Sequence, residues 1–356
     1  MKHLSLPDLA DPVPTDIDEA TARVSERAVA ALRGARILVT GGTGFLGSWL
    51  VDVLLALNHR YRLDLVIYLL TRQEFAFKQK RPDLAVAPQI QLLSGDVRNF
   101  KCPDIRLTHV VHAAADTSAT AAAQPLALAE TILDGSRHVF DIAKRTGAQR
   151  FLFLSSGAVA GRVCDTTALI TEDATTAPSV EDPASSYGNA KRFAEHLLLL
   201  AAAKTRVELV IARGFAFVGP RMPLTGHFAI GNFIHDAVLG YAPRVNSAGI
   251  ALRSYLYAAD AAVWLITLLA LAQPRRIYNV GSDQALTIQA LALQVAKTLQ
   301  APLPALPVFD NRNIDQQHNY VPNISRASTE LALEPLTTLP TAISHTARWA
   351  RNMARP

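Results

Sequence analysis

Arg36-Ile-Leu-Val-Thr40 runs directly into Gly41-Gly-Thr-Gly-Phe-Leu-Gly47, and this stretch decides the fold. An apolar strand, a glycine turn and the start of a helix follow one another, which is the setting that a dinucleotide-binding fingerprint requires. Gly41 permits the tight turn, and Gly44 lets a pyrophosphate approach the free N–H groups of the helix N-terminus. Gly47 allows the helix to pack closely on the strand. A glycine triplet alone is also an ordinary turn, but at the first strand–helix junction it predicts a dinucleotide site.

Short apolar runs alternate with helical patterns on both sides of this junction. The predicted strands are Arg36–Thr40, Leu65–Thr71, Ile90–Gly95, His109–Ala115, Arg150–Ser156, Val207–Arg213 and Tyr278–Gly281. The predicted helices include Phe45–Leu57, Leu126–Arg145, Asn189–Lys204 and Leu286–Leu299. Continuous runs of Val, Ile and Leu separated by helices indicate a parallel sheet covered on both faces. The predicted fold class is therefore α/β, a doubly wound parallel sheet of the Rossmann type with a smaller C-terminal substrate-binding lobe.

The pattern also predicts how the chain is divided. Residues 1–34 form an N-terminal arm and an accessory helix, with a capping box at Thr15 and Asp18 and an apolar stripe. Residues 35–213 form the dinucleotide-binding domain, to which residues 256–282 return. Prolines and glycines interrupt the pattern after Gly214, so residues 214–255 and 283–356 are predicted to form the substrate-binding lobe.

Composition excludes several classes of function. Half of the 356 residues are hydrophobic and 18% are charged, which is typical of a globular chain. The net charge of +5 is spread without a basic run, so we expect no nucleic-acid partner. The two cysteines, Cys102 and Cys164, fit neither a disulfide framework nor a metal site, and no signal peptide or spanning segment is predicted. We expect a cytoplasmic protein with no metal and no membrane partner.

The tip of the second strand bears on the choice between NAD and NADP. A carboxylate at this position binds the ribose 2′-hydroxyl of NAD. Here the strand ends at Leu70-Thr-Arg72, and an arginine can bind a 2′-phosphate through charge-assisted hydrogen bonds. Arg72 therefore favours NADP(H), the alternative being a solvated arginine at a strand end.

Three residues predict a catalytic group. Tyr187-Gly-Asn-Ala-Lys191 opens a helical stretch, and spacing of i to i+4 places phenol and ammonium on one face. A neighbouring ammonium and a positive nicotinamide are expected to lower the pKa of the Tyr187 phenol. Ser156 ends the fifth strand, at the edge where ligands bind in such sheets. Ser156 is expected to hold a substrate oxygen while Tyr187 moves the proton.

In these motifs the chain resembles an extended short-chain dehydrogenase/reductase of the NAD-dependent epimerase/dehydratase family, whose members mostly act on nucleotide sugars. The resemblance spans roughly Gly34 to Trp349. It rests on the glycine fingerprint and on Gly95-Asp-Val97, His112-Ala-Ala-Ala115, Leu154-Ser-Ser156, Tyr187 with Lys191, Val218-Gly-Pro220, Arg253-Ser-Tyr255 with Asp260, and Tyr278-Asn-Val-Gly281.

The resemblance implies a set of cofactor-binding residues. Asp96 and Val97 are expected to hold the adenine, and Ala113 to Ala115 to line the nicotinamide ribose. The full expected set is Gly41, Thr43, Gly44, Phe45, Leu46, Gly47, Arg72, Asp96, Val97, Ala113, Ala114, Ala115, Thr131, Tyr187 and Lys191. Family members also commonly dimerise through the two long helices beside the active site, so a homodimer is expected.

The chain departs from the family pattern at three places. Family dehydratases carry an Asp-Glu pair after the active-site Ser or Thr, and the related decarboxylases a Glu at the second position, where this chain has Gly157 and Ala158. The usual acid–base route of 4,6-dehydration is therefore disfavoured. Ala160 replaces the tyrosine of Val-Tyr-Gly. Ala216 and Asn246 replace an expected Asn and a base-covering aromatic, which leaves the sugar and the base open.

Three further residues are expected to bind the substrate. By similarity Asn232 and Arg253 hold the diphosphate, and a guanidinium with an amide donor suits two adjacent phosphates. The alternatives are a helix N-cap for Asn232 and a surface ion pair for Arg253. Tyr255 is expected to pack in the core with one edge on the substrate. His227 is a lone loop histidine and His112 a buried structural one.

The main functional hypothesis is an NAD(P)-dependent oxidoreductase acting on a nucleotide-activated sugar. Tyr187 takes a proton from a sugar hydroxyl, expected at C4, as hydride passes to the nicotinamide. Return of the hydride to the opposite face gives an epimerase, and cofactor exchange gives a 4-ketoreductase. One alternative is an NADPH-dependent reductase of a non-sugar carbonyl, against which Asn232 and Arg253 argue. Another is a non-catalytic dinucleotide sensor, against which the intact trio of Ser156, Tyr187 and Lys191 argues.

Overall fold

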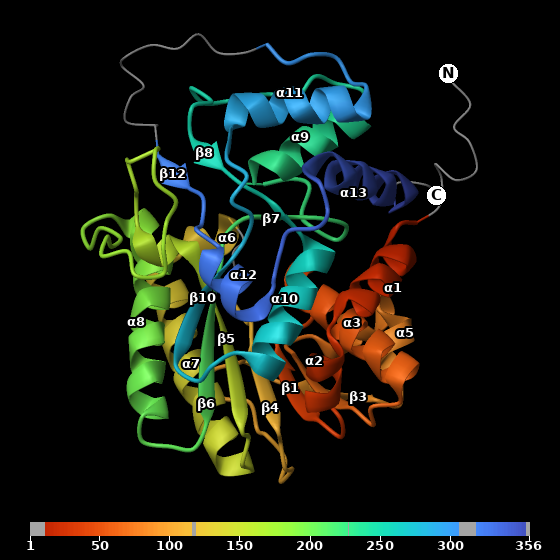
Figure 1. Ribbon diagram of the computed structural model, residues 1–356, viewed down its shortest axis with the longest axis vertical. Helices are drawn as coiled ribbons and strands as arrows, with labels where there is room; N and C mark the ends of the chain where they lie inside the picture. The colour runs from red at the N-terminus through yellow and green to blue at the C-terminus, as the bar shows by residue number, and fades with distance from the viewer. Residues whose placement is uncertain (1–10, 116–118, 227, 306–317, 354–356) are drawn as a thin grey trace.

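The computed structural model describes residues 11–115, 119–226, 228–305 and 318–353. Its main sheet has seven parallel strands in the order β10-β6-β5-β4-β1-β2-β3 (Figure 1). The strands are β1 Arg36–Thr40, β2 Val66–Thr71, β3 Ile90–Ser94, β4 His109–His112, β5 Arg150–Ser156, β6 Glu208–Gly214 and β10 Arg276–Val280. This is the order of a doubly wound dinucleotide-binding sheet with one strand added beside β6. The predicted fold class is confirmed.

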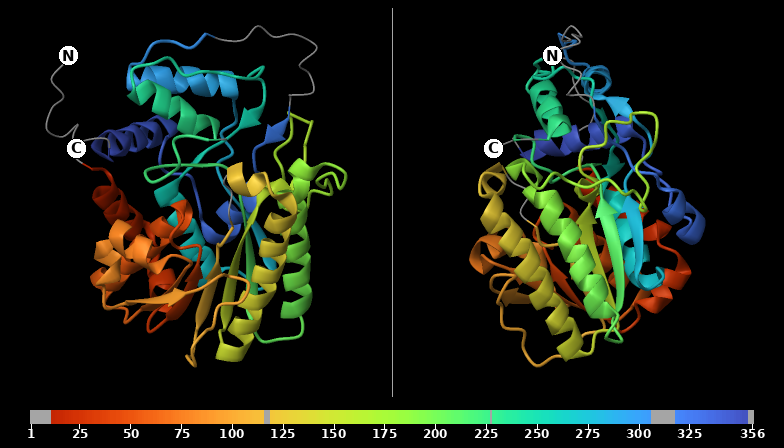
Figure 2. Two further views of the ribbon diagram at one scale, coloured as in Figure 1. Left: turned by 180° about the vertical axis from the view of Figure 1, so that it is seen from behind. Right: turned by 90° about the vertical axis from the view of Figure 1, so that its left-hand side faces the viewer.

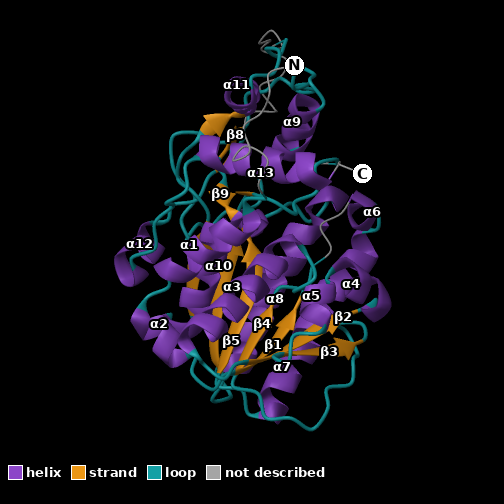
Figure 3. Ribbon diagram, turned by 90° about the vertical axis from the view of Figure 1, so that its right-hand side faces the viewer, coloured by secondary structure: helices purple, strands orange, loops and turns teal. Residues whose placement is uncertain are grey.

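Helices cover both faces of this sheet (Figure 3). One face carries α7 (Pro125–Thr146) and α8 (Ser186–Ala202), which pack against each other along their length. The other face carries α3 (Phe45–Tyr61) and α10 (Ala258–Leu271). Two short helices, α4 (Glu74–Lys80) and α5 (Pro82–Ala85), lie beside β3 at the edge. Because both faces are covered, the central strands are apolar on both sides, as the sequence predicts.

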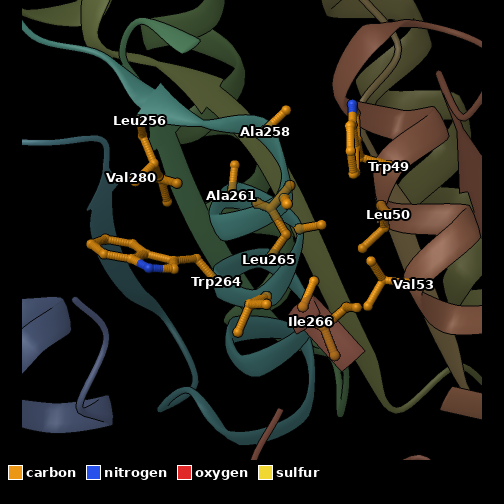
Figure 4. Close-up of a cluster of buried hydrophobic side chains, with 14 of the residues drawn as sticks. Trp49, Leu50, Val53, Leu256, Ala258, Ala261, Trp264, Leu265, Ile266 and Val280 are labelled. Carbon is orange, nitrogen blue, oxygen red and sulfur yellow. The ribbon is translucent and has the colours of Figure 1, made fainter. Parts of the chain in front are cut away.

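The largest part of the core lies where α3 meets α10 (Figure 4). Trp49, Leu50 and Val53 of α3 face Ala261 and other residues of α10, and all of them are buried. Almost every side chain of α10 is buried, which explains why its sequence is a nearly continuous apolar run. No described helix is both long enough and apolar enough to cross a membrane.

A smaller lobe lies above the carboxyl edge of the sheet (Figure 2). Its helices α9 (Ala229–Val238), α11 (Ile288–Leu299) and α13 (Leu339–Met353) pack together. Its three-stranded sheet has the order β11-β8-β12, and a second pair joins β7 to β9. These strands are β7 Phe217–Val218, β8 Leu252–Arg253, β9 Leu256–Tyr257, β11 Leu286–Thr287 and β12 Asn319–Tyr320; short helices α6 (Ala119–Ala122) and α12 (Ser325–Leu331) complete the fold. The domain boundaries given above stay predictions.

The N-terminal segment differs from the single capped helix that the sequence predicts. It forms two helices, α1 (Val13–Arg23) and α2 (Glu26–Ala31). Pro14 fits the first turn of α1, so that helix begins before Thr15, and the predicted capping box is wrong. Val24 is extended, and the Ser25 side chain accepts a hydrogen bond from the Ala28 N–H to begin α2. Residues 1–10 of the predicted arm lie outside the described residues.

Candidate active site

The turn between β1 and α3 is a backbone cradle that side chains would fill. A Cβ at Gly41 would lie 2.5 Å from the carbonyl of Ala113, and one at Gly47 would lie 2.1 Å from the carbonyl oxygen of Gly41. Gly41 also has a φ of 74°, which favours glycine. Thr43 and Gly44 are exposed, and no side chain caps the N-terminus of α3. The N–H groups of Phe45 and Leu46, in the first turn of α3, therefore have no partner within the helix, which fits the pyrophosphate of a dinucleotide.

The loop after β4 lies against this cradle. Ala113 N–H donates to the Thr40 carbonyl at 3.1 Å, and Ala114 N–H donates to the Thr40 hydroxyl at 3.3 Å. Behind them His112 is bound to Thr40 at 2.8 Å and to Ser136 at 3.2 Å. Burial lowers the pKa of His112 to about 3. His112 is thus a neutral, fully bonded core residue that fixes the loop where Ala113, Ala114 and Ala115 are predicted to meet the ribose.

The predicted adenine side lies at the ends of β2 and β3. Asp96 accepts hydrogen bonds from Arg98 at 2.8 and 2.9 Å, and this arginine, with Arg72 acting more weakly, lowers the pKa of the Asp96 carboxyl. Arg72 is exposed at the tip of β2. Val97 is buried against α7, where a Cβ on Gly135 would lie 2.9 Å from it. Thr131 lies one turn before Gly135 on that helix, so the predicted cofactor residues here come together.

The catalytic trio comes from β5 and α8. Ser156 is the last residue of β5, and Tyr187 and Lys191 lie one turn apart in α8. The Lys191 Nζ donates to the Leu154 carbonyl at 2.8 Å and lies 4.6 Å from the centre of the Phe153 ring. Tyr187 is hydrogen-bonded to the Ser156 hydroxyl. The structure therefore brings the three predicted residues to one place at the carboxyl edge of the sheet.

Burial shifts the pKa values of both Tyr187 and Lys191, which the spacing of the two residues does not predict. Burial raises the pKa of the Tyr187 phenol well above its usual value, and the hydrogen bond from Ser156 opposes this only in part. Burial also lowers the pKa of Lys191 to about 7, so its ammonium is itself disfavoured. Spacing of i to i+4 indicated that the two groups share a face, but not how strongly both are desolvated. The chain's own groups thus keep Tyr187 protonated.

A cavity of about 590 Å³ opens between this edge and the lobe. That volume lies in the range of small-molecule sites. Tyr187 lines it from the main domain, and Arg253, His318 and Tyr320 line it from the lobe. Arg162 adds another cation, and none of the described residues that line the cavity carries a carboxylate. The cavity is therefore suited to an anionic ligand.

Arg253 enters this cavity from β8. Its guanidinium is partly buried and bonded to the Leu252 carbonyl at 2.8 Å and to His318 at 2.6 Å. Burial lowers its pKa, and it forms no ion pair with any carboxylate of the described residues. The alternative of a surface ion pair is wrong. A desolvated guanidinium facing a cavity is a suitable partner for an incoming phosphate or carboxylate.

The other predicted substrate residues lie outside the cavity lining. Asn232 lies in α9, where its side-chain amide makes two hydrogen bonds with the backbone of Gly226, at 2.8 and 3.1 Å. The N-cap of α9 is Phe228, so the N-cap alternative for Asn232 is wrong. Tyr255 packs against the hydrophobic core, and burial raises its pKa to about 12. The substrate-binding roles of both residues stay predictions. His227 lies outside the described residues.

Tyr320 is a site residue that sequence reasoning missed. Its hydroxyl lies 3.3 Å from the Ser156 hydroxyl, and its ring centre lies 4.9 Å from that of Phe215. The Arg253 guanidinium lies 5.6 Å from the same ring centre. Tyr320 belongs to β12, in the weakly patterned tail, and no motif marks it. The pairing of β12 with β8, together with its bridge to Val163 in the loop after Ser156, brings it to the end of β5.

The Phe215 ring also explains why Gly157 follows the catalytic serine. A Cβ at Gly157 would lie 2.6 Å from the Phe215 ring. Any side chain at residue 157 would therefore displace the ring that supports Tyr320. The chain fills the space after Ser156 with aromatic rings and has no room for an acidic side chain at 157.

Comparison with known proteins agrees with this geometry. The sequence model of the NAD-dependent epimerase/dehydratase family matches residues 37–281, which is more than half of the chain. The chain belongs to this family. The matched region contains the glycine cradle, the trio and Arg253, whereas Tyr320 lies beyond it.

Relatives within the family have several activities. UDP-glucuronic acid decarboxylase 6 of Arabidopsis thaliana is 29% identical over 310 residues, covering 84% of each chain. Among solved structures, a UDP-N-acetylglucosamine 4-epimerase from Methanobrevibacter ruminantium has a TM-score of 0.76 at 20% identity, covering 90% of this chain and 99% of its own. The UDP-glucose 4-epimerase of Thermus thermophilus, solved with NAD, has a TM-score of 0.72 at 22% identity, covering 89% and 99%. These structures are similar to this chain in fold.

Proposed function

We propose that this protein is an NAD(P)-dependent oxidoreductase that acts on a nucleotide-activated sugar, as a 4-epimerase or a 4-ketoreductase. The proposal is carried by the convergence of Ser156, Tyr187 and Lys191 at the carboxyl edge of the sheet, where Tyr187 lines a cationic cavity, beside a glycine cradle. A bound nicotinamide dinucleotide supplies the hydride chemistry. The cradle of Gly41, Gly44 and Gly47 and the loop from Ala113 to Ala115 are the residues that would hold it, and family relatives of similar fold bind NAD.

The chain's own residues account for the proton transfer. Tyr187 gives a proton to a keto oxygen or takes one from a sugar hydroxyl, and Ser156 orients that oxygen. Because burial keeps the phenol protonated, the acid role is available at neutral pH without further charge. The base role needs positive charge near the phenol, which the Lys191 ammonium and an oxidised nicotinamide would provide.

The nucleotide sugar is inferred from the cavity and from the relatives. Arg253 and Arg162 give the cavity a positive lining, which suits a diphosphate. The relatives named above act on UDP-sugars. A reductase of a neutral carbonyl would have no use for a desolvated arginine, and a non-catalytic sensor would have no use for a phenol bound to Ser156. Identifying the nucleotide that co-purifies with the protein tests the choice between epimerase and reductase. Retained NAD(H) would favour an epimerase, and affinity for NADPH would favour a reductase.

Dehydration and decarboxylation are the activities of several relatives, and we expect the usual acid–base route to 4,6-dehydration to be closed here. Gly157 and Ala158 offer no acid, and the Phe215 ring occupies the space of a side chain at 157. Incubation with dTDP-glucose and NAD should give no 4-keto-6-deoxy product by mass spectrometry. Gly157→Asp should not create this activity and should destabilise the fold by about 1–3 kcal/mol, the usual cost of overpacking. A 4-keto-6-deoxy product formed at ordinary turnover would refute this prediction.

Arg72 tests the choice of cofactor. If its guanidinium binds the 2′-phosphate, Arg72→Ala should weaken NADPH binding by about 1.5–3 kcal/mol, the value of a hydrogen bond to a charged group, and leave NADH nearly unchanged. Isothermal titration with both cofactors measures the difference. Arg60→Ala is a matched control, since Arg60 is an exposed arginine in the last turn of α3 and belongs to no predicted site. Equal loss for both cofactors would remove the basis for preferring NADP(H).

We also propose that the protein forms a homodimer through α7 and α8. These helices lie side by side on one face of the sheet (Figure 2). They expose Leu126, Phe193 and Leu200, and the last two lie seven residues apart on one face of α8. Sedimentation should give a dimer mass for the wild type and a shift to the monomer for Phe193→Glu. A monomeric wild type would contradict this.

A further inference from the structure

Tyr320 brings a second phenol to the reaction centre from the lobe. Its hydroxyl lies 3.3 Å from Ser156 Oγ, and the Ala158 N–H, which donates to Ser156 Oγ at 3.2 Å, also lies near the Tyr320 hydroxyl. The Phe215 ring supports the phenol from behind, and Arg253 lies over its face. Contacts with both the turn after Ser156 and the lobe therefore fix the hydroxyl beside Ser156.

The strand that carries Tyr320 is itself firmly held. In β12 the Asn319 N–H donates to the Val163 carbonyl at 2.7 Å, and its side-chain amide donates to the Ala168 carbonyl at 2.6 Å. Tyr320 pairs with Arg253 in the small sheet. The loop after Ser156 and the lobe are thus joined at β12, so the approach of Tyr320 to Ser156 is built into the fold.

Counting donors and acceptors at Ser156 shows what the second phenol can do. A serine hydroxyl has one proton to donate and can accept two hydrogen bonds. The Ala158 N–H donates to Ser156 at 3.2 Å, and Tyr187 is bonded to Ser156 as well. If Tyr320 also donates, both acceptor positions of Ser156 are filled. Its single proton is then left for an oxygen on the side of Tyr187, where the substrate oxygen is proposed to lie. Burial raises the pKa of Tyr320, so this phenol keeps its proton at neutral pH.

We propose that Tyr320 is a positioning residue, whose O–H donates to Ser156 and so fixes the Ser156 hydroxyl as a donor toward the reacting oxygen. This rests on the proposed function, because a substrate oxygen must meet Tyr187 for the orientation to matter. It gives the lobe a part in the reaction beyond binding the diphosphate.

Tyr320→Phe keeps the ring against Phe215 and Arg253 and removes only the hydroxyl. On the sugar nucleotide that the wild type converts, found among UDP-, dTDP-, GDP- and CDP-sugars, kcat should fall about tenfold, the value of one hydrogen bond, with KM little changed. In a Ser156→Ala background the same change should lower kcat by no more than about twofold, because the two residues act as a unit. Full additivity of the two losses, or no loss in the single variant, would overturn the proposal.

A control variant and a structural readout separate an effect on Ser156 from a general loss of activity in Tyr320→Phe. Tyr278→Phe is a matched control, because Tyr278 is not part of the cavity lining and its hydroxyl donates to Glu330 at 2.7 Å. This change should leave kcat unchanged. Crystal structures of the wild type and Tyr320→Phe give a readout that needs no substrate. Ser156 should hold one rotamer in the wild type and several in the variant; one unchanged rotamer in both would overturn the positioning role. If the wild type converts no sugar nucleotide, the proposed function fails, and the rotamers still decide whether Tyr320 orients Ser156.

Discussion

Replacing Tyr187 by Phe should lower turnover by roughly two to four orders of magnitude, the usual contribution of a positioned acid–base group. The variant keeps the ring but loses the oxygen that is bonded to Ser156. Because the ring still fills its place in α8, the fold and the affinity for the dinucleotide should survive. Steady-state rates on the converted sugar nucleotide, with cofactor titration as a parallel measurement, test both parts.

A control for Tyr187 must remove a buried phenol without touching the proton transfer. Tyr255→Phe removes a phenol that is buried outside the cavity lining and should cost far less turnover. Near-wild-type turnover of Tyr187→Phe would show that another group moves the proton. A large loss of cofactor binding in Tyr187→Phe would mean that the phenol acts mainly in binding.

Replacing Lys191 by Met should separate activity from stability. Turnover should fall by at least about two orders of magnitude, because the phenol loses its neighbouring ammonium. Dinucleotide affinity should also fall by roughly 1.5–3 kcal/mol, the value of a hydrogen bond from a charged donor. The folded chain should be no less stable at neutral pH, since a buried ammonium is replaced by an apolar side chain of similar length.

The pH dependence of stability follows from the lowered pKa of Lys191. Burial lowers this pKa from 10.5 to about 7, so between these values the unfolded chain binds a proton that the folded chain does not. Stability of the wild type relative to Lys191→Met should therefore rise as the pH rises from about 7 to 10.5, and stay constant below that window. Urea unfolding of both proteins across this range measures the difference. A flat difference would mean that the ammonium is well solvated or paired in the fold.

The main sheet could be predicted closely because its strands are buried on both faces. β1 and β5 have the bounds that the sequence predicts, and the glycine turn lies where the fingerprint places it. The lobe was harder, since β8, β11 and β12 are two residues long and have no periodicity of their own. The prediction of a single N-terminal helix was wrong, although one apolar stripe runs through the segment. Pro14 lies in the first turn of α1 and Ser25 caps the start of α2, so the segment forms two helices.

The catalytic trio could be predicted from spacing, whereas its surroundings could not. Spacing places Tyr187 and Lys191 on one helical face, but burial, which only tertiary packing determines, raises the pKa of Tyr187 within the chain itself. Tyr320 is far from Ser156 in the sequence and lies beside it because β12 pairs with β8, so no local sequence pattern predicts the contact. Gly157 could be read as the loss of an acid, but its contact with Phe215 appears only in three dimensions.

The most direct test of the account is transfer of a labelled hydride. Sugar nucleotides that carry deuterium at C4 are incubated with the protein and NAD or NADP, and the nicotinamide and the sugar are analysed by mass spectrometry. The account predicts that deuterium passes from C4 to the nicotinamide within one turnover, and that Tyr187→Phe blocks the transfer. A 4-epimerase returns the deuterium to C4 of the inverted sugar, so the labelled nicotinamide is found when the reaction is quenched within a turnover, whereas a 4-ketoreductase run towards the keto sugar leaves it on the released nicotinamide. Conversion of the sugar with C4 deuterium lost to solvent, or with no labelled nicotinamide at any time within a turnover, would contradict the account.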